Sequence, residues 1–104
     1  MGPLPDVWQA EWCPYSHRVR LALTYRGVDF VARQVPADRA ERTAMLAATG
    51  HVAIPTFVDV DGTVVRGGDE ILDHLAARYP ERDDAVAHRA KAVDDLPPEW
   101  RRER

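Results

Sequence analysis

The residues best suited to chemistry form a short run near the N-terminus: Trp12, Cys13, Pro14, Tyr15 and Ser16. Cys13 is the only cysteine in the chain, and proline is favoured as the first residue of a helix. A cysteine directly before such a helix faces unpaired N–H groups and the positive end of the helix dipole, which favour the thiolate over the thiol. The run therefore predicts a nucleophile at Cys13. The alternative is a small buried apolar side chain, the commoner role of a lone cysteine.

The helix that positions this thiol is predicted to begin near Pro14. Apolar residues follow with helical spacing, and Gly27 is a stop signal. Residues 6–10 predict a short strand that runs into the cysteine loop, and residues 28–35, with β-branched and aromatic side chains in partial alternation, predict a second strand. A strand, a helix and a strand in this order form a unit whose two strands are parallel.

The second half of the chain is predicted to add a helix, two strands and a helix, at residues 37–49, 51–60, 63–66 and 69–79. Met45 and Leu46 form a narrow apolar stripe on the first of these helices. The two strands are adjacent and antiparallel, because Asp61 and Gly62 between β-branched runs are a strong hairpin signal. The order β-α-β-α-β-β-α indicates an α/β fold, with a mixed four-stranded sheet and helices on both faces.

Residues 81–104 differ from the rest in composition. A weak apolar stripe is formed by Val86, Ala90, Val93 and Leu96. It predicts a loosely packed helix that ends near Leu96, followed by a mobile tail in which Trp100 either docks on the body or is exposed. We therefore expect a domain at residues 1–80 and a C-terminal extension, helix and tail, at residues 81–104.

Length, charge and cysteine content exclude several classes of protein. A chain of 104 residues suits one domain with a modest core. One cysteine forms no internal disulfide, which fits a reducing, cytoplasmic location. The net charge of -3 argues against a nucleic-acid partner, and no apolar run approaches the ~20 residues that span a bilayer. The N-terminus lacks the pattern of a secretion signal, and the four histidines lack the spacing of metal ligands, so we expect no metal.

Pro55 is a second unusual residue, because within the run 51–60 it stands directly before the residues that form the third strand. One interpretation is a cis Ile54–Pro55 bond that turns the backbone groups of Ile54 outward, toward an extended peptide-like ligand. The alternative is an ordinary trans proline at the first residue of a strand. Only about 5–6% of such bonds are cis in folded proteins, so base rates alone favour the trans form.

Asp69 and Glu70 follow two glycines at the start of the last helix of the domain. Free N–H groups there can bind a carboxylate and the two side chains can hold an ammonium group, so the helix start suits an amino-acid head group. The alternative is that both residues are ordinary helix caps.

Tyr15 and Ser16 lie in the turn after the cysteine, where the tyrosine can lean over the site and the serine stands where a dithiol enzyme has its second cysteine. Their alternatives are a half-exposed aromatic residue and a helix-start serine. His17, Arg18 and Arg20 add positive charge near the thiol, and we interpret them mainly as a solvated helix face.

Taken together, the Cys-Pro-Tyr-Ser run, the Ile54–Pro55 pair and the helix start at Asp69 and Glu70 resemble the glutathione site of the glutaredoxin and glutathione S-transferase families. Residues 13–28 are especially similar to the N-terminal, thioredoxin-fold domain of the transferases, and the resemblance covers residues 6–79. It implies a thioredoxin-like fold of the glutaredoxin type with a reacting thiol at the cysteine position. It also implies that glutathione is the co-substrate.

The resemblance implies a role for each of these site residues. Cys13 would react, the backbone of Ile54 would pair with the cysteinyl part of glutathione, and Pro55 would be cis. Asp69 and Glu70 would hold the γ-glutamyl end. In transferases, a cysteine at the position of Cys13 is associated with thiol exchange rather than with conjugation.

Ser16 departs from the dithiol glutaredoxins and excludes a two-cysteine route within one chain, and Ala10 stands where those proteins often have a lysine. Transferases also have a helical second domain that is larger than residues 81–104 and supplies the pocket for the electrophile. The leading hypothesis is therefore a monothiol glutathione-dependent thiol-disulfide oxidoreductase, which removes glutathione from glutathionylated small molecules or proteins through a Cys13–glutathione mixed disulfide. We expect a monomer or weak homodimer.

Two alternatives remain open at this point. One is a non-catalytic glutathione-binding module or stand-alone transferase-like domain, whose last residues join a partner. The other is a carrier of a glutathione-ligated [2Fe–2S] cluster, as monothiol glutaredoxins are. Tyr15 counts against the carrier, since those proteins usually have a glycine directly after the cysteine.

Overall fold

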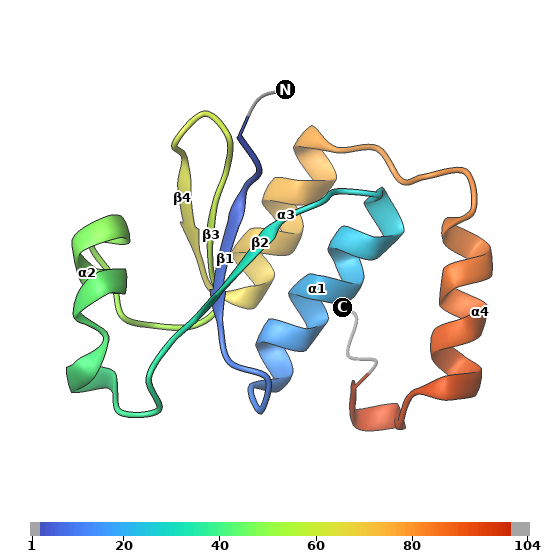
Figure 1. Ribbon diagram of the computed structural model, residues 1–104. Coiled ribbons are helices and arrows are strands. Elements are labelled where there is room, and N and C mark those ends of the chain that lie inside the picture. Colours follow the sequence, from blue (N-terminus) through green and yellow to red (C-terminus); the bar gives the residue numbers. More distant parts are fainter. Residues whose placement is uncertain (1–2, 101–104) are drawn as a thin grey trace.

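The computed structural model describes residues 3–100 and contains the predicted α/β fold, with four strands in one sheet (Figure 1). The strands are β1 (Asp6–Gln9), β2 (Val31–Gln34), β3 (Thr56–Val58) and β4 (Val64–Arg66), in the order β2-β1-β3-β4. β1 and β2 are parallel, and the other two pairs are antiparallel. Helices α1 (Pro14–Arg26) and α3 (Gly68–Arg78) lie on one side of the sheet and α2 (Thr43–Thr49) on the other, which confirms the predicted layers.

The core lies between the sheet and the helix pair α1 and α3. Its central side chains have no solvent exposure; they are Val7, Val19, Leu23, Phe57, Ile71 and Leu75. They come from β1, α1, β3 and α3, so burying them removes apolar surface from water only when all four elements are in place. The core therefore holds the two helix N-termini of the candidate site against the same sheet.

Helix α1 begins and ends where its sequence signals predict. Cys13 is its N-cap, Pro14 its first residue and Gly27 its C-cap, with φ at 64° in the left-handed region that favours glycine. The N–H of Val28 donates to the carbonyl oxygen of Leu23 at 3.0 Å, so the chain after the glycine still closes the helix end. For this reason β2 begins at Val31, later than the predicted residue 28.

The continuous helix predicted at residues 37–49 is wrong in its first half. A short 3₁₀ turn, η1 (Arg39–Glu41), precedes α2. Arg42 separates the two because its buried guanidinium donates to the carbonyl oxygens of Pro36, Ala37 and Val52. These bonds hold the segments before η1 and after α2 together.

The predicted apolar stripe of α2 is half right. Met45 is buried, whereas Leu46 is 52% exposed. The helix therefore packs through one large apolar side chain, because its neighbour in the sequence points about 100° around the helix axis.

A buried carboxylate fastens the hairpin of β3 and β4 to α3. The side chain of Asp59 has no exposure, and it accepts hydrogen bonds from His74 at 2.7 Å, from Tyr79 at 2.5 Å and from the backbone N–H of Val60. Burial raises the pKa of Asp59, but these hydrogen bonds outweigh it and the pKa lies below its ordinary value of 3.8. The bond to Asp59, together with burial, raises the pKa of Tyr79 to about 12.

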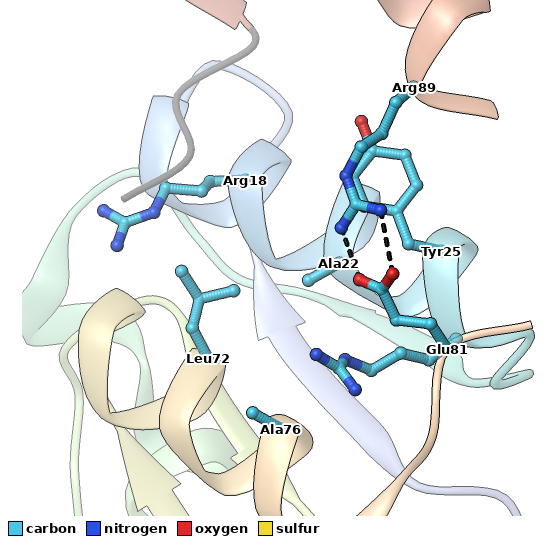
Figure 2. A pocket seen from close by; sticks show the side chains of 8 residues that line it. Arg18, Ala22, Tyr25, Leu72, Ala76, Glu81 and Arg89 are labelled. Carbon is cyan, nitrogen blue, oxygen red and sulfur yellow. Dashed lines mark hydrogen bonds and ion pairs between the residues drawn. The ribbon is translucent and has the colours of Figure 1, made fainter. Parts of the chain in front are cut away.

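Helix α4 (Ala85–Asp95) packs with a different face from the one predicted. Val86 and Val93 of the predicted stripe are 78% and 61% exposed, whereas Ala85 and Ala92 are buried. Arg89 decides the orientation, because its guanidinium lies 4.4 Å above the ring centre of Tyr25. It also pairs with Glu81, as the dashed lines in Figure 2 show.

The chain after α4 turns back onto the start of α1. A 3₁₀ turn, η2 (Pro98–Trp100), brings Trp100 against His17, with ring centres 4.9 Å apart. Trp100 thus combines the two predicted alternatives, because it contacts the body through His17 and is still 43% exposed. The predicted tail beyond Trp100 lies outside the described residues. No helix within residues 3–100 is long and apolar enough to cross a membrane.

Candidate functional site

The sulfur of Cys13 lies at the N-terminus of α1, as predicted. Cys13 has extended backbone angles, and its Sγ accepts a hydrogen bond from the backbone N–H of Ser16 at 3.4 Å. That N–H is one of the groups left without an intrahelical partner in a first turn. The sulfur therefore occupies the N-cap position and accepts a hydrogen bond from one of the free N–H groups of the first turn.

Cys13 is 6% exposed, yet it lines two separate cavities. The thiol is therefore neither sealed in the core nor fully open to water. Burial of this degree limits contact between the Cys13 thiol and oxidants in solution, whereas the two cavities let a bound molecule approach Cys13.

The larger cavity, here called the Ile54 cavity, has a volume of about 430 Å³. Its lining residues are Trp12, Cys13, Pro14, Tyr15, Ala37, Arg39, Arg42, Ala53 and Ile54. The Ile54–Pro55 bond is cis, as the resemblance implies and against the base rate. No hydrogen bond within residues 3–100 engages the backbone of Ile54, so its polar groups are available to an extended ligand.

The start of α3 is joined directly to this cis-proline turn. The N–H of Gly67 donates to the carbonyl oxygen of Pro55 at 3.0 Å. A Cβ placed on Gly68 would lie 3.8 Å from the Cβ of Tyr15 and 3.7 Å from a guanidinium nitrogen of Arg18. The first turns of α1 and α3 therefore lie side by side, with the proline turn between Cys13 and the acidic residues of α3.

The two acidic residues at the start of α3 have different surroundings. Asp69 forms an ion pair with Arg18, whose side chain is 11% exposed. The Glu70 side chain is exposed and has no hydrogen bond or ion pair within residues 3–100. Neither residue lines the Ile54 cavity itself. Of the two carboxylates, that of Asp69 is paired with Arg18, whereas that of Glu70 is exposed.

Tyr15 and Ser16 occupy opposite environments. Tyr15 is 49% exposed and lines the Ile54 cavity, where its ring can contact a ligand. Ser16 has no exposure, and its hydroxyl has no hydrogen-bond partner within the described residues. Its contact with the thiol is made by the backbone N–H instead.

The expectation that Arg18 and Arg20 form a solvated helix face is wrong. Their side chains are only 11% and 17% exposed, because each is held by a carboxylate. Arg20 pairs with Glu11 at 2.8 Å and also donates to Gln9. Both guanidinium groups therefore link α1 to neighbouring segments, and a carboxylate balances the positive charge of each.

The basic groups beside the thiol are Arg39 and Arg42, which the sequence analysis did not single out. Both line the Ile54 cavity, and Arg39 is exposed. A topological signal was present: β1 and β2 are parallel, so the segment after β2 leaves the sheet at the same edge as the Cys13 loop. These residues give the cavity positive charge that suits a carboxylate.

The second cavity beside the thiol has a volume of about 260 Å³ and is here called the Trp100 cavity. Its lining residues are Glu11, Trp12, Cys13, Pro14, His17, Glu99 and Trp100. It exists because His17 holds the end of η2, with its Nδ1 2.9 Å from the carbonyl oxygen of Trp100. The sequence analysis left the role of this segment open.

A third cavity, of about 250 Å³, lies away from the thiol between α1, α3 and α4 (Figure 2). Ala22, Leu72 and Ala76 supply its apolar side chains, and no cysteine, serine or threonine lines it. It therefore offers no thiol and no aliphatic hydroxyl group. No group of three or more potential metal ligands occurs within residues 3–100.

Comparisons with known proteins agree with this arrangement. The chain is 27% identical over 66 residues to glutaredoxin 3 of Escherichia coli K12, an alignment that covers 64% of the chain and 78% of the relative. Its fold is similar to a glutathione S-transferase from Rhodospirillum rubrum (TM-score 0.63, 24% identity, 74% of this chain and 34% of the other). It is also similar to a rice transferase in complex with glutathione (TM-score 0.67, 22% identity, 90% and 46%).

The chain thus spans less than half the length of these two solved transferases, and the likeness to them concerns the fold alone. The family assignment rests on a different comparison. The family model described as "Glutathione S-transferase, N-terminal domain" matches residues 8–83, which include the second half of β1, the Cys13 turn, the cis-proline turn and α3. The chain therefore belongs to the family of glutathione S-transferase N-terminal domains.

Proposed function

We propose that the protein is a monothiol, glutathione-dependent thiol-disulfide oxidoreductase with Cys13 as its nucleophile. The observation that carries the proposal is the hydrogen bond from the Ser16 N–H to the Cys13 sulfur, in a cavity that also presents the unpaired backbone of Ile54. Relatives in the glutaredoxin and transferase groups support glutathione as the co-substrate.

In the first step, the Cys13 thiolate attacks the glutathionyl sulfur of a mixed disulfide. A bond forms between the Cys13 sulfur and the glutathionyl sulfur, and the original disulfide breaks. The partner leaves as a thiolate and takes up a proton from water. The Cys13 thiolate is thereby oxidised to a mixed disulfide while the partner is reduced to its thiol, and the step needs one cysteine only.

In the second step, the thiolate of another glutathione attacks the glutathionyl sulfur on Cys13. Oxidised glutathione leaves and the Cys13 thiolate is restored, so over the cycle the partner is reduced to its thiol and one further glutathione is oxidised into the disulfide that leaves. The Ile54 backbone would align the cysteinyl residue of glutathione, Arg39 would face a carboxylate, and Glu70 would attract the ammonium group.

Mass spectrometry of the intact protein tests the first step. After incubation with a small glutathionylated disulfide, the protein is expected to gain one glutathionyl group, and peptide mapping should place it on Cys13. Excess reduced glutathione should remove it. An unmodified Cys13 in a protein that still binds glutathione would contradict the proposal and favour the non-catalytic module.

We predict that Glu70→Gln raises the dissociation constant for glutathione about 3- to 10-fold, because the amide no longer attracts the ammonium group across a partly solvated gap. Isothermal titration calorimetry measures the constant directly. Asp29→Asn is the matched control, since it removes one exposed carboxylate from the loop at the far end of α1. Equal weakening in both variants would show a general charge effect and contradict the role of Glu70.

A further inference from the structure

The Trp100 cavity and the Ile54 cavity share three lining residues, Trp12, Cys13 and Pro14, so Cys13 borders both. Ala37, Arg39 and Arg42 of the Ile54 cavity precede α2 in the chain, whereas Glu99 and Trp100 of the Trp100 cavity belong to η2. In Figure 1, α2 and the red η2 segment lie on opposite sides of the start of α1. A mixed disulfide has two halves, and both must extend away from the attacked sulfur–sulfur bond. A substrate bound at Cys13 therefore has a separate cavity available for each half.

The two cavities differ in chemistry. The Ile54 cavity contains the guanidinium groups of Arg39 and Arg42 and suits the carboxylate-bearing glutathionyl half. The Trp100 cavity contains two tryptophans, 66% and 43% exposed, and the carboxylates of Glu11 and Glu99. These groups suit a cation.

Glu99 is the free carboxylate of the Trp100 cavity. The charge of Glu11 is shared with Arg20 at 2.8 Å, whereas Glu99 has no hydrogen bond or ion pair within residues 3–100. Tryptophan has the strongest attraction for cations among the aromatic side chains. An exposed tryptophan beside an unpaired carboxylate recognises a lysine or arginine side chain better than a neutral or acidic one.

Trp100 is held in place by two residues that lie outside η2, His17 and Pro97. His17 contacts Trp100 twice, through its Nδ1 at 2.9 Å from the carbonyl oxygen and through an edge-to-face ring contact at 4.9 Å. The N–H of Trp100 also donates to the carbonyl oxygen of Pro97 at 2.9 Å. The aromatic wall is thus part of the folded domain, and its volume of about 260 Å³ accommodates one long side chain.

We infer that the Trp100 cavity is a second binding site, which selects glutathionylated peptide segments that carry a lysine or arginine beside the modified cysteine. Trp100 and Glu99 are its specificity-determining residues. As a substrate site this inference rests on the proposed function, because the partner thiolate would leave into this cavity when Cys13 attacks the glutathionyl sulfur.

The kinetic test uses two synthetic pentapeptides with one glutathionylated cysteine, flanked by lysines in one peptide and by glutamates in the other. The expected ratio of kcat/KM, lysine peptide over glutamate peptide, is about 10 for the wild type, the factor that a partly desolvated cation–aromatic contact supplies. Trp100→Ala is expected to lower this ratio toward about 1, and Glu99→Gln to lower it about threefold. A ratio near 1 in an active wild type, or a ratio unchanged by Trp100→Ala, would overturn the inference.

Asp94→Asn is the matched control for Glu99→Gln. Both variants remove one exposed carboxylate from the C-terminal segment, but Asp94 does not line the Trp100 cavity. The control should keep the wild-type ratio. An equal fall in both variants would mean that net charge, rather than the cavity, discriminates between the peptides, and it would also overturn the inference.

A binding measurement separates this inference from the proposed function. Calorimetry with the lysine peptide in S-methylated form needs no reaction, and Cys13→Ser protein is used as the background. Trp100→Ala in that background is expected to weaken binding at least about fivefold. If the protein reduces no mixed disulfide, the proposed function fails, but the binding result still shows whether the Trp100 cavity binds the lysine peptide. Equal binding by both proteins would overturn the binding role of the Trp100 cavity and leave the proposed function standing.

Discussion

Cys13→Ser is expected to lower the rate of glutathione-coupled reduction of a small mixed disulfide by at least about 1,000-fold, to the uncatalysed background. A serine hydroxyl at the N-cap is not ionised near neutral pH and forms no disulfide with glutathione. The chain contains no second cysteine to replace it. The rate is measured by coupling the formation of oxidised glutathione to its enzymatic reduction by a nicotinamide cofactor.

The same variant should keep its fold and its affinity for glutathione. Serine is a favoured N-cap residue and can accept the hydrogen bond that the sulfur accepts from the Ser16 N–H. The thermal unfolding midpoint and the calorimetric dissociation constant for glutathione should therefore remain close to those of the wild type. A variant that binds glutathione and turns over at the wild-type rate would remove the thiol from the mechanism.

Asp59→Asn is expected to lower the free energy of unfolding by about 2–4 kcal/mol, the cost of breaking a buried charged hydrogen-bond network. The Asp59 side chain has no exposure and accepts bonds from His74 and Tyr79 of the α3 segment. An asparagine presents an NH₂ group to one of these donors and leaves it without an acceptor. Urea denaturation followed by circular dichroism measures the change.

The exposed neighbour of this network offers a matched control. Asp61 pairs with Arg78 at 2.8 Å, but both side chains are more than 40% exposed, so Asp61→Asn should change the unfolding midpoint little. A loss in the control as large as that in Asp59→Asn would show that the hairpin turn as a whole, and not the buried carboxylate, fastens β3 and β4 to α3.

The contribution of Asp59 has a defined dependence on pH. Its pKa is lowered in the folded protein, so the folded state releases this proton more readily than the unfolded chain, whose ordinary value is 3.8. The stabilisation is fully present above that ordinary value and is lost as the pH falls through the lower, folded one. The difference in unfolding free energy between wild type and Asp59→Asn should therefore be constant near neutral pH and shrink below about pH 4.

Local signals in the sequence were sufficient for the parts of the site that depend on local backbone geometry. Cys13 as the N-cap of α1, Pro14 as its first residue and Gly27 as its C-cap follow from residue types at adjacent positions. The hairpin around Gly62 follows in the same way, from a turn that needs a positive φ. The cis form of the Ile54–Pro55 bond did not follow from base rates and was expected only from the resemblance.

The sequence did not indicate which face of a helix packs against the rest of the protein. Val86 and Val93 form the more apolar stripe of α4, yet the helix packs through Ala85 and Ala92. The partners that decide this, Tyr25 and Glu81, act on the helix from other elements through Arg89. Hydrophobic periodicity measures how apolar each face is, and it contains no information about which face meets an arginine-binding neighbour.

The sequence by itself determined the α/β order, the cysteine at the N-cap of α1 and the helix N-terminus at Asp69 and Glu70. Only the tertiary structure decided that Asp69 is held by Arg18 while Glu70 is left unpaired. Only the tertiary structure also placed Trp100 beside Cys13. The physical reason is range: caps and turns depend on residues a few positions apart, whereas ion pairs and cavity walls join residues that meet only after the sheet and the core have formed.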